Sequence, residues 1–138
     1  MNIEIDNVKY STRSAMDTFT QLKVARRLGP AVPLIEGLVA KENLEKDRTL
    51  VLLLMFSHIK EEDMMYVIQH CLELVDRQEG DGQPVAVQRN GTLMFDTIPM
   101  DTLLKVAVHV VEENIGDFFR TALSTLEAER KKLENSSE

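Results

Sequence analysis

Apolar residues recur at helical spacing through two long stretches of the chain, and this periodicity restricts the fold more than any other feature. One face of a helix opened by Pro99 would bury Leu103, Leu104, Ala107, Val108, Val111 and Ile115. One face of a helix running from Glu61 to about Arg77 would bury Met64, Val67, Ile68, Cys71 and Val75. Because such stripes must be covered by other elements, the chain is expected to be mainly helical.

The helical pattern near the end of the chain is interrupted. Residues Asn114 to Asp117 include Asn and Gly, which predict a break after the helix that Pro99 opens. The apolar pattern then resumes in a last helix with Phe118, Phe119, Ala122, Leu123 and Leu126.

A further helix is predicted from Ser14 to Leu28. Ser14 can cap its start, and Gly29 and Pro30 supply a stop signal. At 100° per residue, one broad side of this helix would carry Leu22, Val24, Ala25 and Leu28. The opposite side would carry Lys23, Arg26 and Arg27.

Two shorter helices are expected before residue 60. Proline is tolerated in a first turn, so a helix can begin near Ala31 and turn inward Val32, Ile35, Leu38 and Val39. The charged residues 41–48 read as a surface connection. Leu50 to Phe56 is leucine-rich, which favours a short buried helix, with a buried strand as the alternative.

Two β-hairpins complete the prediction. Ile3 and Ile5 alternate with acids before a turn at Asp6-Asn7, and Asn90-Gly91 separates two further apolar runs. The two hairpins could form one small sheet. The predicted class is therefore α+β, mainly α-helical, with about five or six helices and one or two short hairpins. Residues 1–134 would form a single domain, and residues 135–138 a disordered tail.

Composition excludes several classes of function. The net charge is −7 and the pI is near 5.0, which argues against binding nucleic acid or an anionic membrane. The first residues lack the features of a signal peptide, and the longest apolar run, Leu50 to Phe56, is too short to cross a bilayer. A single cysteine fits a reducing compartment, so we expect a soluble cytoplasmic protein.

The sequence gives no positive argument for catalysis. The three histidines, His58, His70 and His109, show no metal-binding spacing with one another or with Cys71. Cys71 lies on an apolar stripe, which predicts a buried thiol rather than a nucleophile. No nucleotide-binding or hydrolase motif is present. We therefore expect no catalytic residues, no cofactor and no metal, and a role in binding or assembly.

The basic side formed by Lys23, Arg26 and Arg27 has two interpretations. It can be a solvated face that nearby acids balance. It can also be a docking surface for an acidic partner or a neighbouring copy of the chain.

Two segments resemble a known family. Residues 21–30, which include Ala25-Arg26-Arg27-Leu28, resemble the A-R-R-L-A-P stretch of tail assembly chaperones from long-tailed bacteriophages. Residues 114–119, Asn-Ile-Gly-Asp-Phe-Phe, are similar to the N-[LI]-G-x-F-F segment late in the same proteins. The order of the predicted elements matches as well, so the resemblance covers most of the chain.

The resemblance implies a specific role in a phage or prophage. Such chaperones bind and solubilise the aggregation-prone tape measure protein in the host bacterial cytoplasm and help to recruit tail tube subunits. A longer form, made by ribosomal frameshifting, is common, and the chaperone is not expected in the mature virion. Partner-binding residues would come from the two matching segments: Lys23, Arg26, Arg27, Phe118 and Phe119.

Two other classes of protein stay open from the residues alone. The first is a small cytoplasmic regulatory adaptor or interaction module with no phage role. The second is a ligand-binding or enzymatic domain, which a deep polar pocket with strongly shifted pKa values would favour.

Overall fold

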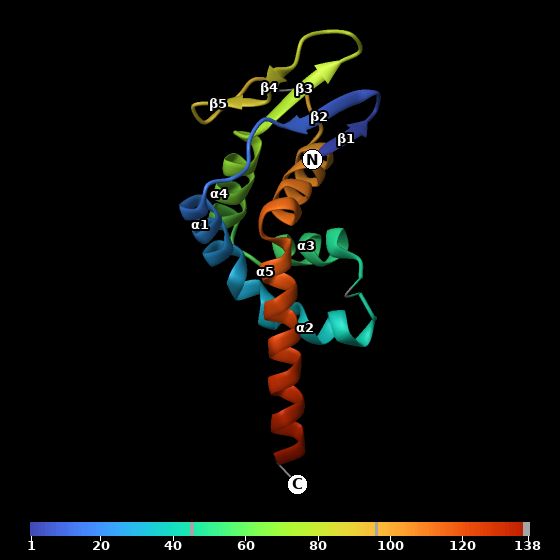
Figure 1. Cartoon of the computed structure of the whole chain (residues 1–138), viewed down its shortest axis with the longest axis vertical. Coiled ribbons are helices and arrows are strands. Elements are labelled where there is room, and N and C mark those ends of the chain that lie inside the picture. The colour runs from blue at the N-terminus through green and yellow to red at the C-terminus, as the bar shows by residue number, and fades with distance from the viewer. Residues whose placement is uncertain (45, 96, 137–138) are drawn as a thin grey trace.

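The computed structural model describes residues 1–44, 46–95 and 97–136, apart from the side chains of Leu123 and Ser136. Helices form the body, and a small antiparallel sheet covers one end of it (Figure 1). The helices are α1 (Thr18–Leu28), α2 (Val32–Lys41), α3 (Arg48–Ser57), α4 (Glu61–Leu72) and α5 (Met100–Ser136). A 3-10 helix, η1 (Gly29–Ala31), joins α1 to α2. The predicted α+β, mainly helical class is confirmed.

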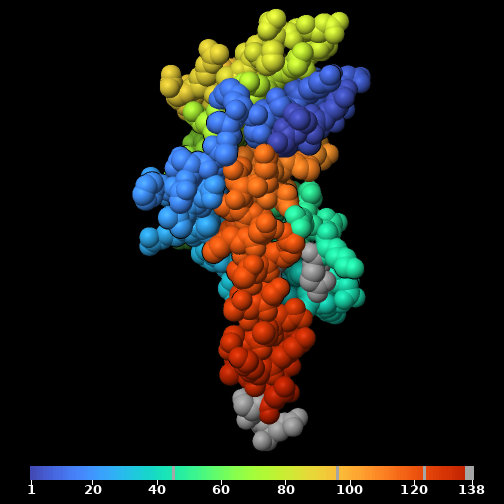
Figure 2. Space-filling model, in the orientation of Figure 1, coloured from blue at the N-terminus to red at the C-terminus, as the bar shows by residue number. Residues whose placement is uncertain are grey.

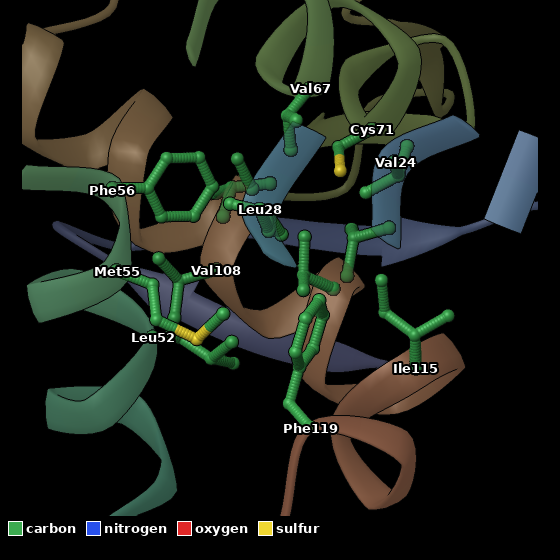
Figure 3. Close-up of a cluster of buried hydrophobic side chains, with 14 of the residues drawn as sticks. Val24, Leu28, Leu52, Met55, Phe56, Val67, Cys71, Val108, Ile115 and Phe119 are labelled. Atoms are coloured by element: carbon green, nitrogen blue, oxygen red, sulfur yellow. The ribbon is translucent and has the colours of Figure 1, made fainter. Parts of the chain in front are cut away.

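The long helix α5 organises the body. Helices α2, α3 and α4 all pack against it, and its last turns extend beyond the other elements (Figure 1). The core between these helices is mainly aliphatic, and Figure 3 shows it around Leu28 of α1, Met55 of α3, Val67 of α4 and Phe119 of α5. Each of these four side chains is almost fully buried.

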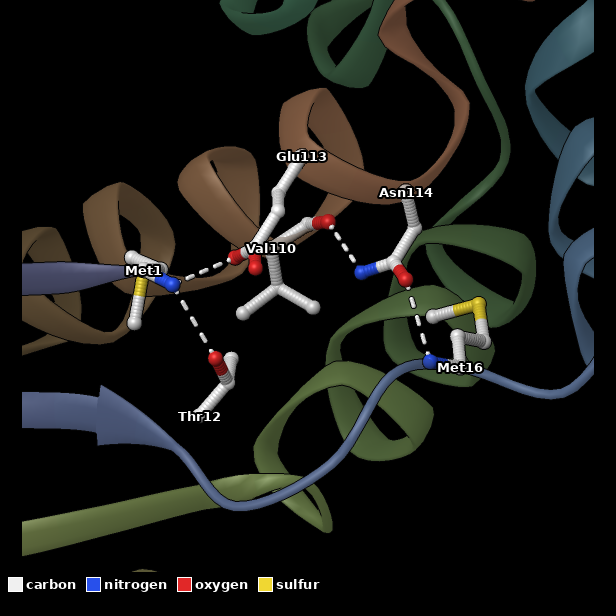
Figure 4. A network of polar contacts seen from close by, with 6 residues as sticks. All are labelled: Met1, Thr12, Met16, Val110, Glu113 and Asn114. Atoms are coloured by element: carbon white, nitrogen blue, oxygen red, sulfur yellow. Dashed lines mark hydrogen bonds and ion pairs between the residues drawn. The ribbon is translucent and has the colours of Figure 1, made fainter.

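The predicted break in this helix is absent, because residues 114–117 lie inside one helix of 37 residues. The Asn114 side chain does not cap a helix end. Its Nδ2 donates to Val110 O at 2.8 Å, and its Oδ1 accepts from Met16 N at 3.0 Å (Figure 4). Gly116 leaves room for the Glu112 side chain, which reaches across to Arg48 on α3 at 2.7 Å. The two predicted last helices are therefore one, and it includes Asn135 and Ser136, whereas Ser137 and Glu138 lie outside the described residues.

Helix α1 begins later than Ser14. Its N-cap is Asp17, whose side chain accepts hydrogen bonds from Thr20 N at 2.9 Å and from Thr20 Oγ1 at 2.7 Å. The bonds from Thr20 hold the pKa of the Asp17 carboxyl below its usual value. The helix ends at Leu28, as Gly29 and Pro30 predicted.

Helices α2 and α3 follow their predictions with one exception. Val32, Ile35 and Val39 point inward, but Leu38 is 43% exposed rather than buried. The segment Leu50 to Phe56 lies in a helix, α3, rather than in the alternative strand. Asp47 caps this helix by accepting from Leu50 N at 3.1 Å.

The sheet has the strand order β1-β2-β3-β4, formed by β1 (Asn2–Ile5), β2 (Val8–Thr12), β3 (Val75–Glu79) and β4 (Val85–Ala86). The first hairpin is confirmed, with Asp6 and Asn7 at positive φ in its turn. Strand β3 was missed, since the predicted helix to Arg77 ends at Leu72. Val75 continues the apolar spacing of α4, but backbone pairing with β2, with Tyr10 opposite Arg77, holds these residues extended.

The second hairpin is confirmed but short. It joins β5 (Gln88–Arg89) to β6 (Thr92–Leu93), and Asn90 and Gly91 both have positive φ in its turn. It forms a two-stranded sheet of its own rather than joining the first hairpin. The Gly91 amide donates to Glu73 Oε1 at 2.9 Å, which ties this turn to the end of α4.

The backbone of Gly91, with φ of +76°, leads to a stability prediction. Gly91→Ala should lower the free energy of unfolding by about 1 kcal/mol, because a Cβ disfavours this conformation. Gly29→Ala is the matched control, since Gly29 has a right-handed helical conformation and open space around it. Urea denaturation would measure the stability of both variants. An unchanged midpoint for Gly91→Ala would contradict the positive φ of Gly91 in the turn.

The thiol of Cys71 gives a second prediction. Cys71 is fully buried, and burial raises its pKa to about 12. Labelling by a thiol reagent should therefore be slow in the native protein and fast in denaturant. Met65→Cys in a Cys71→Ser background should label rapidly, because Met65 is 45% exposed on the same helix. Equally fast labelling of Cys71 and of the cysteine at position 65 in the native protein would mean that α4 does not turn Cys71 toward the core.

Candidate protein-interaction surface

One side of α1 is exposed and carries both apolar and basic side chains. We name Phe19, Leu22, Lys23 and Arg26 the α1 outer face. Phe19 is 76% exposed and Leu22 61% exposed, and α1 stands out at the left of the body in Figure 2. Val24 and Leu28 point to the core instead. The prediction that Leu22 shares their side is therefore wrong, because on α1 Leu22 lies nearer to Arg26 than to Val24.

The two adjacent arginines of α1 have different surroundings. Arg27 Nη1 lies 2.7 Å from Asp63 Oδ1 on α4, and its guanidinium lies 4.2 Å from the centre of the Tyr66 ring. Arg26 is exposed, and neither it nor Lys23 forms an ion pair with any residue of the described part. Arg27 thus joins α1 to α4, whereas Lys23 and Arg26 keep their charges toward solvent.

The two adjacent phenylalanines of α5 differ in the same way. Phe119 is 2% exposed and belongs to the core, as Figure 3 shows. Phe118 is 58% exposed and packs edge-on against Phe119, with ring centres 5.2 Å apart. Phe118 lies one helical turn after Asn114, whose side chain bonds the residue just before the α1 cap. It is therefore exposed on the side of α5 that faces the start of α1.

Two exposed leucines on α2 were missed as candidates. Leu34 is 62% exposed and Leu38 43% exposed. They stand four residues apart, on a different side of α2 from the buried Val32, Ile35 and Val39. The sequence does contain a signal that could have identified them. The number of apolar residues in α2 is larger than a single inward-facing stripe needs.

A cleft of about 470 Å³ lies between the segment before α1, the end of α4 and the turn at Gly91. Its acid, Glu73, accepts from Gly91 N at 2.9 Å and from Gln88 Nε2 at 3.2 Å. These two bonds hold the pKa of the Glu73 carboxyl below its usual value, and the bond from Gly91 has the larger effect. The carboxylate therefore fastens the second hairpin to α4, which is a structural task.

Residues 1–44, 46–95 and 97–136 contain neither a cluster of metal ligands nor a helix able to span a membrane. No group of three or more His, Cys, Asp or Glu side chains there is placed to hold a metal ion. Within the same residues, no helix combines the length and the apolar character that crossing a bilayer requires.

The exposed face of α1 and the exposed Phe118 form a candidate protein-interaction surface. The family model described as "Phage tail assembly chaperone protein, TAC" matches residues 6–127, and the chain belongs to this family. The resemblance seen in the sequence is thereby confirmed. Comparisons with curated proteins and with solved structures gave no significant match.

The different surroundings of Arg26 and Arg27 give a stability prediction. Arg27→Gln should lower the free energy of unfolding by about 1 kcal/mol, because it removes a half-exposed ion pair and a cation–π contact. Arg26→Gln is the matched control and should change it by less than about 0.5 kcal/mol. Thermal and urea unfolding would measure both, and equal effects would contradict the separation of their roles.

Proposed function

We propose that this chain is a non-catalytic chaperone that binds the tape measure protein and keeps it soluble during tail assembly. It would act in the cytoplasm of the host bacterium and leave before the virion is complete. Recruitment of tail tube subunits, through a longer frameshifted form, is part of the proposal. Membership of the tail assembly chaperone family supports a role in phage tail assembly. The observation that carries the binding role is the α1 outer face, on which large apolar and basic side chains stand exposed together.

The α1 outer face suits a partner helix of a particular kind. Phe19 and Leu22 offer apolar area, and Phe118 adds an aromatic ring on the neighbouring side of α5. An amphipathic helix could bury its apolar stripe on these side chains. Lys23 and Arg26 would then meet acidic residues at the edge of that stripe.

The other two candidate residues support this surface instead of contacting the partner. Arg27 holds α1 against α4, and Phe119 fills the core beneath Phe118. In the proposal, Lys23, Arg26 and Phe118 touch the tape measure protein, whereas Arg27 and Phe119 are positioning residues. In the proposal, residues 1–134 act as one domain, which the contact of Arg130, near the end of α5, with Glu36 on α2 at 3.3 Å supports.

Co-expression with the tape measure protein tests the proposal. Phe118→Ala and Arg26→Gln should each weaken binding by roughly tenfold and lower the amount of soluble tape measure protein. Their thermal midpoints should stay close to that of the unmodified chain, because both side chains are exposed.

The controls separate binding from folding. Met100→Ala removes an apolar side chain that is 83% exposed at the start of α5 and should keep full activity. Phe119→Ala should cost about 3 kcal/mol or more in stability, because Phe119 is buried. Full activity of both Phe118→Ala and Arg26→Gln would remove the α1 side of the molecule from the interface.

A further inference from the structure

Helix α4 has an exposed face whose chemistry is opposite to that of α1. We name Glu61, Glu62, Met65 and Gln69 the α4 outer face. All four residues are exposed. In the described part of the chain, Glu61 and Glu62 form no ion pair, whereas the next residue, Asp63, is paired with Arg27. This face therefore combines negative charge with one flexible apolar side chain.

The two outer faces belong to one antiparallel pair of helices. Arg27 at the end of α1 bonds Asp63 at the start of α4. At the other end, Thr20 near the start of α1 and His70 near the end of α4 line the same cleft. Leu28 of α1 and Val67 of α4 point into the core (Figure 3). The outer faces of both helices thus lie on the outside of the pair, one basic and one acidic.

We propose that two copies of the chain associate through this helix pair, with the α1 outer face of each copy on the α4 outer face of the other. A twofold axis parallel to the helices produces this arrangement, and each contact is then made twice. Because Arg27 and Asp63 lie at the same level of the pair, this axis also brings Arg26 to the level of Glu62 in the second copy. By the same register Leu22 lies within one helical turn of Met65 in the second copy, which adds apolar contact to the charge pairing.

The charges of the chain explain why a second copy fits. The cations of the α1 outer face are exposed although the chain has a net charge of −7. The acids of α4 lie on the adjacent helix of the same molecule, so every copy brings both halves of the interface. Each half has few residues, and a small interface of this kind gives weak association that depends on concentration. The dimer covers the α1 outer face, so a partner bound there would compete with it.

Two charge-reversed variants test the dimer. One carries Lys23→Glu and Arg26→Glu, and the other carries Glu61→Lys and Glu62→Lys. Each variant alone would place like charges against each other, so its dissociation constant should rise by at least about tenfold. In an equal mixture, the acidic α1 of the first variant meets the basic α4 of the second, and the two unmodified faces meet as before. The mixture should therefore form heterodimers about as strongly as the unmodified chain forms homodimers.

Sedimentation velocity over a concentration series, at low and at high salt, would measure these associations. The unmodified dimer should weaken at high salt, because its contacts include exposed charges. A mixture that stays monomeric, or an unmodified chain that stays monomeric at the highest concentration, would overturn the proposal. Lysines in the first turn of α4 oppose the helix dipole, so thermal midpoints are measured in parallel. If that variant unfolds, Glu61→Gln with Glu62→Gln replaces it, and unchanged dimerisation of this substitute would overturn the proposal as well.

The same variants separate the dimer from the chaperone role. The Glu61→Lys, Glu62→Lys variant should still solubilise the tape measure protein, because its α1 outer face is intact. If the mixed variants form no heterodimers but the unmodified chain solubilises the tape measure protein normally, the dimer is rejected and the chaperone role stands. Conversely, the mixed variants could form heterodimers while the unmodified chain fails to solubilise the tape measure protein. That result would reject the chaperone role and leave the dimer standing.

Discussion

The burial of α5 on all sides but one along its first half is the constraint on which the rest of the fold depends; the remaining side carries the exposed Lys105 and Glu113. Val106, Val108, Val110 and Val111 point in different directions around this helix, yet none of them is accessible to solvent. One layer of helices cannot cover all of these directions. Helices α2, α3 and α4 must therefore pack around α5, and the sheet lies over its beginning (Figure 1). Only one side of α1 helps to cover the core around α5, and the other side of α1 is therefore left exposed.

The sequence predicted those elements whose cause is local. The helical spacing from Leu103 onward, the stop at Gly29 and Pro30, and the turn at Asn90-Gly91 all have local physical causes. It failed where distant residues decide the structure. Val75 fits the stripe of α4 but is held in a strand by β2, and Asn114 bonds a residue far from it in the chain instead of ending a helix. The wrong prediction for Leu22 has a local cause instead, because helical spacing already places Leu22 nearer to Arg26 than to Val24.

The candidate site shows the same limit at the level of single residues. Adjacent residues on a helix point about 100° apart, so a repeated pair such as Arg26-Arg27 or Phe118-Phe119 tends to divide between inside and outside. The sequence identified both pairs but could not say which member holds the fold. The positions of Asp63 and Tyr66 decide this for Arg27, and the core between α3 and α5 decides it for Phe119.

The bond between Asn114 and Met16 also has a consequence for the order in which the chain folds. It joins residues 98 positions apart, and β2 must likewise wait for β3, which begins at Val75. During synthesis, the first strands and the segment before α1 therefore leave the ribosome well before their partners exist. Contacts of such long range slow folding, because a large loop must close before they form. A chain built this way can pair its sheet once Ala86 has been made, but it completes its core only when most of α5 exists, so the α1 outer face is set in place late in translation.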